Sequence, residues 1–182
     1  IVFPNILKKV ADYYNKAYVL IEINDLGQQV ADAMQFELEY DNMMMVTQRG
    51  RAGQVLGGGF SGRGNQLGLR MTKGTKKIGT SNLKSLIEGD KLLIQDFDII
   101  SELSTFISRG KSFEAEQGAH DDLVMCLVIF SWCANQRYFK ELTNVDVRGQ
   151  MFTEQQNAIE ADMAPFGFID DGLNDPDGNN NS

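Results

Sequence analysis

Two adjacent acids, Asp121 and Asp122, stand at the start of an apolar run that covers residues 123–130. The run has no polar side chain except Cys126, so a helix over it is apolar on all sides and is expected to be buried. Placing two neighbouring carboxylates beside a core is costly without compensation. The free amides of a helix N-terminus can compensate, and so can a divalent cation held with further oxygen ligands. The pair therefore predicts either a helix cap or a metal site.

A third acid, Glu22, interrupts the β-branched and aromatic segment 18–24. That segment predicts a strand buried on both faces. Carboxylates are rare inside such strands, so Glu22 either forms a salt bridge with a nearby lysine or has a functional role. Ligands of open α/β sheets bind at the carboxyl ends of strands, and Glu22 lies near one of those ends.

If Glu22 converges with the acid pair, the three carboxylates form an oxygen-rich cluster at the edge of one core. Such a cluster suits Mg²⁺ or Mn²⁺, the hard ions that serve phosphodiester hydrolysis. Two ions could bind both the attacking water and the leaving oxygen. We therefore treat Glu22, Asp121 and Asp122 as candidate catalytic residues.

The apolar periodicity also predicts the elements that position these acids. The two predicted strands that flank the second helix form a strand–helix–strand unit, which is parallel and right-handed in nearly all proteins. Thr80 or Ser81 is the expected cap of the third helix, and Gly110 closes the fourth. Besides the helix after the acid pair, the predicted helices cover residues 5–17, 26–40, 76–89 and 98–109, and the predicted strands cover residues 18–24, 42–47 and 91–95.

The charge is divided unevenly along the chain, whose net charge is -8. Residues 141–182 contain nine acids and one base, whereas residues 48–87 contain eight Lys or Arg and no acid. This asymmetry indicates a polyanionic partner for the middle of the chain. The glycine-rich stretch 48–74 within it is loop-like. It predicts either a flexible hairpin or disordered insertion, or a mobile basic arm that touches a nucleic-acid backbone.

Other functional classes are disfavoured. The longest apolar run is too short to cross a bilayer, so we expect no membrane partner. One histidine and two cysteines on a single helix do not supply a zinc site, and Cys126 and Cys133 are expected to be reduced core residues of an intracellular protein. We divide the chain into a core at residues 1–140, with an insertion at 48–72, and a partly disordered acidic extension at 141–182.

Three segments resemble the nuclease domain of the large terminase subunit of T-even-type tailed phages. They are residues 19–24 (VLIEIN), residues 75–79 (TKKIG) with residues 83–88 (LKSLIE), and residues 118–125 (GAHDDLVM). The resemblance runs from about residue 4 to residue 135. It implies an α/β fold of the ribonuclease H-like, resolvase type, with a mixed sheet flanked by helices. It also implies a divalent-metal-dependent DNA endonuclease that cuts concatemeric viral DNA into genome units.

The resemblance assigns roles to individual residues. Glu22 and Asp122 match metal ligands of the family, Asp121 is an auxiliary or capping carboxylate, and His120 is a neighbour of the ligands. The DNA contacts expected from the basic segment are Arg70, Lys73, Lys76 and Lys77.

One departure affects the expected activity. In the family the first metal-binding acid lies on a strand before the first helix, and this sequence has no acid before Asp12. We therefore expect the sheet's first strands to be lacking and cleavage by this chain alone to be weak or absent. The implied partners are double-stranded viral DNA, the ATPase motor domain of a longer parent chain, the phage portal and the small terminase subunit, in the host cytoplasm during assembly.

Two alternatives remain open. A Holliday-junction resolvase shares the fold and the clustered acids, and would prefer four-way junctions to linear duplex DNA. A non-catalytic docking module would instead use the acidic tail or the glycine-rich loop to bind another packaging component.

Overall fold

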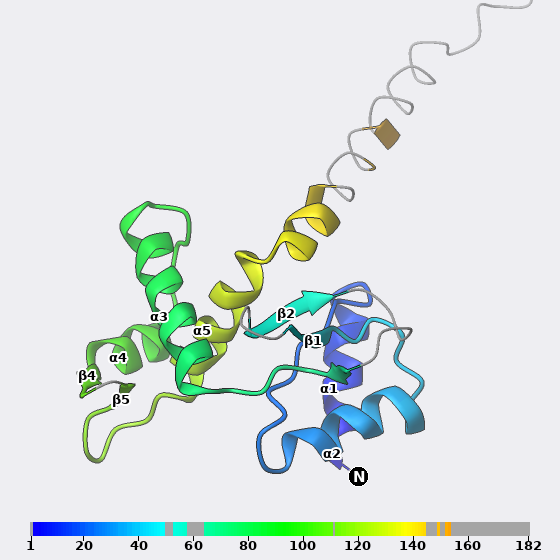
Figure 1. Cartoon of the computed structure of the whole chain (residues 1–182), viewed down its shortest axis with the longest axis horizontal. Helices are drawn as coiled ribbons and strands as arrows, with labels where there is room; N and C mark the ends of the chain where they lie inside the picture. The colour runs from blue at the N-terminus through cyan, green and yellow to red at the C-terminus, as the bar shows by residue number, and fades with distance from the viewer. Residues whose placement is uncertain are drawn as a thin grey trace, which may run out of the picture. The chain divides into compact units, whose positions relative to one another are not determined.

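The computed structural model describes residues 2–49, 53–57, 64–110, 112–144, 149 and 152–153. The chain divides into two compact units, Ile1–Leu142 and Thr143–Ser182. The first unit holds the helices and strands labelled in Figure 1. Most of the second unit, including the part of the acidic tail for which disorder is predicted, lies outside the described residues.

The first two predicted helices are present with shifted ends. Helix α1 covers Val2–Tyr13, because Pro4 is tolerated in the first turn, and the chain leaves the helix before Asn15, whose φ is 58°. Helix α2 covers Gly27–Asp32 and continues as the π-helical turn η1, Ala33–Glu37. Both helices contribute to one hydrophobic cluster, through Ala11, Ala31 and Met34.

Residues 18–24 run extended between α1 and α2 but form only two isolated bridges, both parallel, from Val19 to Met43 and from Glu22 to Leu69. The first bridge confirms the parallel strand–helix–strand unit. The expected burial on both faces is wrong, since Ile23 is buried whereas Tyr18 is 46% exposed. The segment lacks a continuous ladder, so it has fewer neighbours than a central strand.

Side chains of this segment alternate between two clusters. Val19, Ile21 and Ile23 pack with α1 and α2, whereas Leu20 packs on the opposite side with Trp132 of α5. Successive side chains of an extended segment point to opposite faces. Glu22 therefore lies on the face of Leu20, toward α5.

The described part of the glycine-rich stretch contains strands, two of which pair antiparallel as expected of a hairpin. Strand β1 (Met45–Arg49) pairs antiparallel with β2 (Gly53–Gly57) and with β3 (Asn65–Leu67), in the order β2-β1-β3. After β3 the chain turns at Gly68, where φ is 87° and an added Cβ would lie 2.3 Å from the Ile21 carbonyl oxygen. Only glycine fits this approach, which brings Leu69 beside Glu22.

The second half of the unit contains α3 (Lys73–Glu88), α4 (Phe97–Ser104), β4 (Phe106–Arg109), β5 (Ser112–Ala115) and α5 (Asp122–Ala134). The predicted helix at 98–109 is wrong in its second half, because residues 106–109 pair antiparallel with β5 and Phe106 stacks on Phe113. The predicted strand at 91–95 is also wrong, since these residues form no strand. Thr72, rather than Thr80 or Ser81, caps α3.

Helix α5 is buried on one side only. Val124, Val128 and Trp132 are buried, whereas Leu123 and Phe130 are 38% and 43% exposed. Cys133 is buried as expected, but Cys126 is exposed, which corrects its assignment as a core residue. Composition showed an all-apolar helix, yet the described elements leave part of its surface open: α3 and α4 pack against it, and Trp132 and Cys133 pack in the cluster that contains Met44 and Leu69.

The described elements thus form a mixed α/β unit. No helix in the described part of the chain is long and apolar enough to cross a membrane.

Candidate functional site

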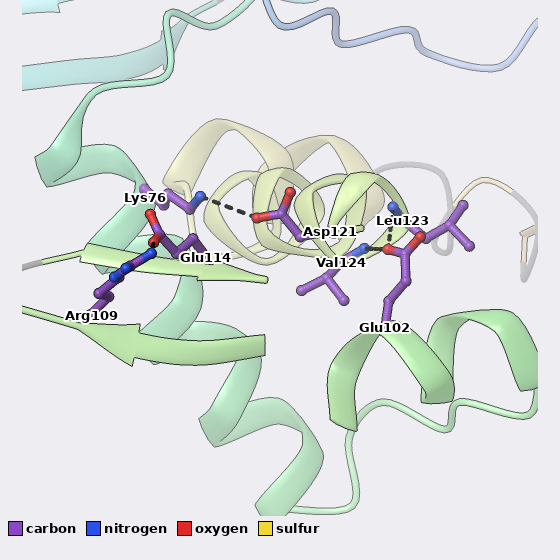
Figure 2. A network of polar contacts seen from close by, with 7 residues as sticks. All are labelled: Lys76, Glu102, Arg109, Glu114, Asp121, Leu123 and Val124. Atoms are coloured by element: carbon purple, nitrogen blue, oxygen red, sulfur yellow. Dashed lines mark hydrogen bonds and ion pairs between the residues drawn. The ribbon is translucent and has the colours of Figure 1, made fainter. Parts of the chain in front are cut away.

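Lys76 joins α3 to the start of α5. Its Nζ lies 3.5 Å from an Oδ2 atom of Asp121, and the two side chains are 19% and 27% exposed. Figure 2 shows the lysine reaching from α3 toward the first turn of α5. The same ammonium lies 5.6 Å from the centre of the Phe106 ring, a cation–π distance. Lys76 is therefore held between a carboxylate and an aromatic face.

Asn24 connects the segment that bears Glu22 to the helix that bears Lys76. Its side-chain amide donates to the Met71 carbonyl oxygen at 3.0 Å and accepts from the Met71 amide at 2.9 Å. One residue later the Thr72 hydroxyl accepts a hydrogen bond from the Thr75 amide at 3.1 Å and starts α3. This contact joins residues 47 positions apart, and the sequence pattern gave no sign of it.

Glu22 is half-buried and lies within electrostatic reach of both Lys76 and Asp121. Burial raises the pKa of Glu22 above its ordinary value of 4.5, Lys76 opposes this shift, and Asp25 and Asp121 add to it. We call Glu22, Asp25, Asp121 and Lys76 the acid–lysine cluster. Residues about a hundred positions apart thus act electrostatically on one another, whereas the gathering of Glu22, Asp121 and Asp122 into one metal-binding cluster stays a prediction.

Asp122 is exposed and begins α5. It lies within electrostatic reach of Cys126: partial burial raises the pKa of that thiol, and Asp122, Glu102 and Glu22 raise it further. Asp122 and Glu22 therefore both act on a side chain near the start of α5. Asp121, however, is the member of the pair whose charge acts on Glu22.

The cap of α5 comes from a different helix. Asp121 occupies the N-cap position but its side chain forms no capping hydrogen bond, so the expected capping role is wrong. Instead, one Oε2 atom of Glu102 on α4 accepts from the amides of Leu123 at 2.8 Å and Val124 at 3.1 Å (Figure 2). The negative charge of this carboxylate also interacts favourably with the positive end of the helix dipole. This leaves Asp121 available to Lys76.

The predicted DNA-binding residues lie around the start of α3. Lys73 and Lys77 are exposed and line a groove of about 540 Å³, which the β4–β5 hairpin closes with Ser108, Gly110 and Phe113. Arg70 is exposed as well, and its backbone is held by the side chain of Gln54 at 2.6 and 2.9 Å. Lys76, by contrast, points into the acid–lysine cluster.

This combination of carboxylates, a basic groove and a mixed α/β fold can be compared with known families. The family model described as a terminase RNaseH-like domain matches residues 2–130. The chain belongs to this family. A terminase domain of this kind has a nuclease-like fold and a role in DNA packaging, and its partners in general are DNA and a packaging motor.

His120 of the terminase domain is exposed and lines a separate depression of about 430 Å³ with Asp98, Glu102 and Leu123. Only its place in the sequence, next to Asp121, links it to the acid–lysine cluster, and its role as a neighbour of metal ligands stays a prediction.

The donor chemistry of the terminase cluster fits a hard divalent cation, because Mg²⁺ and Mn²⁺ prefer carboxylate oxygens. The repulsion that Asp25 and Asp121 exert on Glu22 is also of the kind that a cation relieves. Across residues 2–49, 53–57, 64–110 and 112–144, however, no three His, Cys, Asp or Glu side chains gather to hold a metal ion. A metal at this place therefore requires a closer approach of the acids or a further ligand.

Replacing Glu102 with alanine tests the cap of α5. The variant leaves two amides without their acceptor, and loss of a helix cap typically costs about 1–2 kcal/mol of unfolding free energy. Glu102→Gln keeps an acceptor oxygen and should lose less than half as much. Urea denaturation of both variants measures the difference, and an unchanged midpoint for Glu102→Ala would show that α5 does not depend on this contact.

Glu22 should make the protein less stable at neutral pH. Its pKa is raised in the folded state, so the folded protein holds the proton more tightly than the unfolded chain, and stability falls as pH rises above about 4.5 through the raised pKa. Glu22→Gln removes this cost. We expect the variant to be more stable than the wild type at pH 7, with the difference vanishing below pH 4.5. Denaturation midpoints across this range test it, and a variant less stable at pH 7 would contradict it.

Proposed function

We propose that this terminase domain is a divalent-metal-dependent DNA endonuclease that cuts concatemeric viral DNA during genome packaging in a phage-infected cell. The observation that carries the proposal is the acid–lysine cluster, in which Lys76 pairs with Asp121 at 3.5 Å and both charges act on Glu22, which lies about a hundred positions from Asp121 in the sequence. The match to the terminase RNaseH-like family supports it, because the family combines a nuclease-like fold with DNA packaging.

In this proposal Glu22 and Asp122 would hold two divalent ions, either Mg²⁺ or Mn²⁺. Asp121 assists through its ion pair with Lys76. When bound, such ions polarise phosphoryl oxygens and favour deprotonation of water. The protein's own part is to hold the acids in place: Asn24 fixes the end of the Glu22 segment and Glu102 fixes the first turn of α5. Hydrolysis adds the hydroxyl of water to phosphorus, breaks one phosphodiester P–O bond and transfers the remaining proton to the leaving oxygen.

The groove beside α3 supplies a place for the DNA backbone. Lys73 and Lys77 face it from exposed positions, and Arg70 lies just before the helix. Lysine and arginine contacts to phosphates give affinity without sequence preference. Such contacts suit an enzyme that cuts packaged DNA. The ATPase motor domain, the portal and the small terminase subunit complete the proposed assembly in the host cytoplasm.

Removal of divalent metal tests the proposal. The longer parent protein, which we expect to carry the first metal-binding acid, should nick supercoiled plasmid in Mn²⁺ or Mg²⁺. It should lose this activity in EDTA and regain it when Mn²⁺ is added in excess. Linear duplex should be cut at least as well as a four-way junction. Nicking that persists in EDTA would contradict the metal role, and a strong preference for the junction would favour a resolvase.

A further inference from the structure

Lys76 differs from the other basic residues of its helix in where its charge is placed. Lys73 and Lys77 are exposed at the groove, and Lys84 is 72% exposed and pairs with Glu88 one turn later. Lys76 is only 19% exposed and directs its ammonium to Asp121. An ammonium group is strongly hydrated in water, so withdrawing it requires compensating partners.

The charged partner of Lys76 adjoins the acids that are proposed to hold metal. Asp121 lies 3.5 Å from the Nζ atom of Lys76. The positive charge of Lys76 also lowers the pKa of Glu22 and so opposes the effects of Asp25 and Asp121 on it. The ring of Phe106 supports the ammonium from another side at 5.6 Å. One positive charge thus balances several carboxylates that otherwise repel one another.

We propose that Lys76 is a tethered counter-ion that pairs with Asp121 and opposes the binding of divalent metal at the neighbouring acids Glu22 and Asp122. This inference rests on the proposed metal-dependent function and adds a control on it. Metal binding releases the ammonium from Asp121, and the four-carbon stem of lysine then lets it turn toward the groove of Lys73 and Lys77. The domain alone therefore binds metal weakly, and the polyanionic backbone of DNA, by attracting the released lysine, strengthens metal binding.

The test is calorimetric titration of Mn²⁺ into the full-length wild type and the Lys76→Met variant, without DNA. Methionine keeps the apolar stem beside Phe106 and removes the charge. Since one unit charge a few ångströms from a metal ion is removed, we expect Mn²⁺ to bind about tenfold more tightly to Lys76→Met. Lys84→Met is the matched control, because it removes the same charge and an ion pair from the same helix. Lys84 lies about 12 Å further along the helix, which is more than the Debye length of about 8 Å, so its charge is largely screened from the acid–lysine cluster. This variant should change the affinity less than about twofold.

Thermal unfolding in EDTA provides a second measurement that does not depend on cleavage. Lys76→Met should unfold at a lower temperature than Lys84→Met, because its acids lose their counter-ion, and Mn²⁺ should raise its unfolding temperature more than that of the wild type. Adding Asp121→Asn to Lys76→Met should recover much of the loss in EDTA, which a purely local effect of the methionine would not allow.

The outcomes separate the two proposals. Equal or weaker Mn²⁺ binding by Lys76→Met, with clear binding by the wild type, overturns the competition and leaves the metal-dependent nuclease intact. Absence of Mn²⁺ binding in both proteins overturns the metal site and the competition with it. Tighter binding by Lys76→Met together with an unchanged Lys84→Met supports both.

Discussion

Glu22→Gln is expected to lower Mn²⁺-dependent nicking by the full-length protein by at least about 100-fold. The change removes a charged oxygen ligand while keeping the shape of the side chain, and metal ions stabilise phosphoryl-transfer transition states by several kcal/mol. Each 1.36 kcal/mol lost is about tenfold in rate. Glutamine has the same size as glutamate, so it should leave the fold intact at this half-buried position. Unfolding would therefore not explain the loss of nicking.

Three further variants make this result specific. Asp12→Asn is the control, since Asp12 pairs with Lys8 on α1 at 2.8 Å and lies outside the acid–lysine cluster. Asp122→Asn is expected to match Glu22→Gln. Asp121→Asn should lose less, because its part in the reaction passes through Lys76. Undiminished nicking by Glu22→Gln or Asp122→Asn would remove the assignment of these acids.

Gly79→Ala is expected to destabilise the protein by about 2–3 kcal/mol, the upper part of the range for overpacking a close contact. An added Cβ on Gly79 would lie 2.5 Å from the Val128 carbonyl oxygen and 2.7 Å from its Cγ1 atom. The nearest atom is backbone, so α3 or α5 must move. Since α3 carries Lys76 and α5 follows Asp121, the movement should also weaken their ion pair.

Gly74→Ala on the same helix is the matched control with the opposite sign. The Cβ of that variant would meet only the Thr72 hydroxyl, at 3.8 Å. Alanine is favoured over glycine in a helix by up to about 1 kcal/mol, so this variant should be unchanged or more stable. Urea denaturation of the pair checks both signs, and a Gly79→Ala protein as stable as Gly74→Ala would show that the helices have room to separate.

Local patterns predicted most of the elements. The 3.6-residue spacing located α1 and α3, the continuous apolar run located α5, and the short apolar runs located residues 18–24 and β1. These signals depend on neighbours within a few positions. That Glu22 and Asp121 influence each other could also be expected, because an acid at a strand end and an acid at a helix start both belong at the edge of a core.

The errors arose where a distant residue decides the outcome. An acid before an apolar helix favours a local cap, yet Glu102 takes the amides of α5 from 21 positions away and Lys76 takes Asp121. Likewise, Phe106 and Ile107 fit the helical spacing of α4, but pairing with β5 turns them into a strand. Cys126 is exposed because no described element covers that side of α5, which composition does not report.

The hydrogen bonds of Gln54 and Asn24 have a consequence for how the chain can be altered. They fix the backbone at Arg70 and Met71, just before α3 begins, and β1 pairs with both β2 and β3. The placement of Lys76 therefore depends on two side-chain amides that carry no charge and lie far from it in the sequence. Substitution of Gln54 or Asn24 can shift the start of α3 and alter the acid–lysine cluster while leaving every charge of that cluster in place.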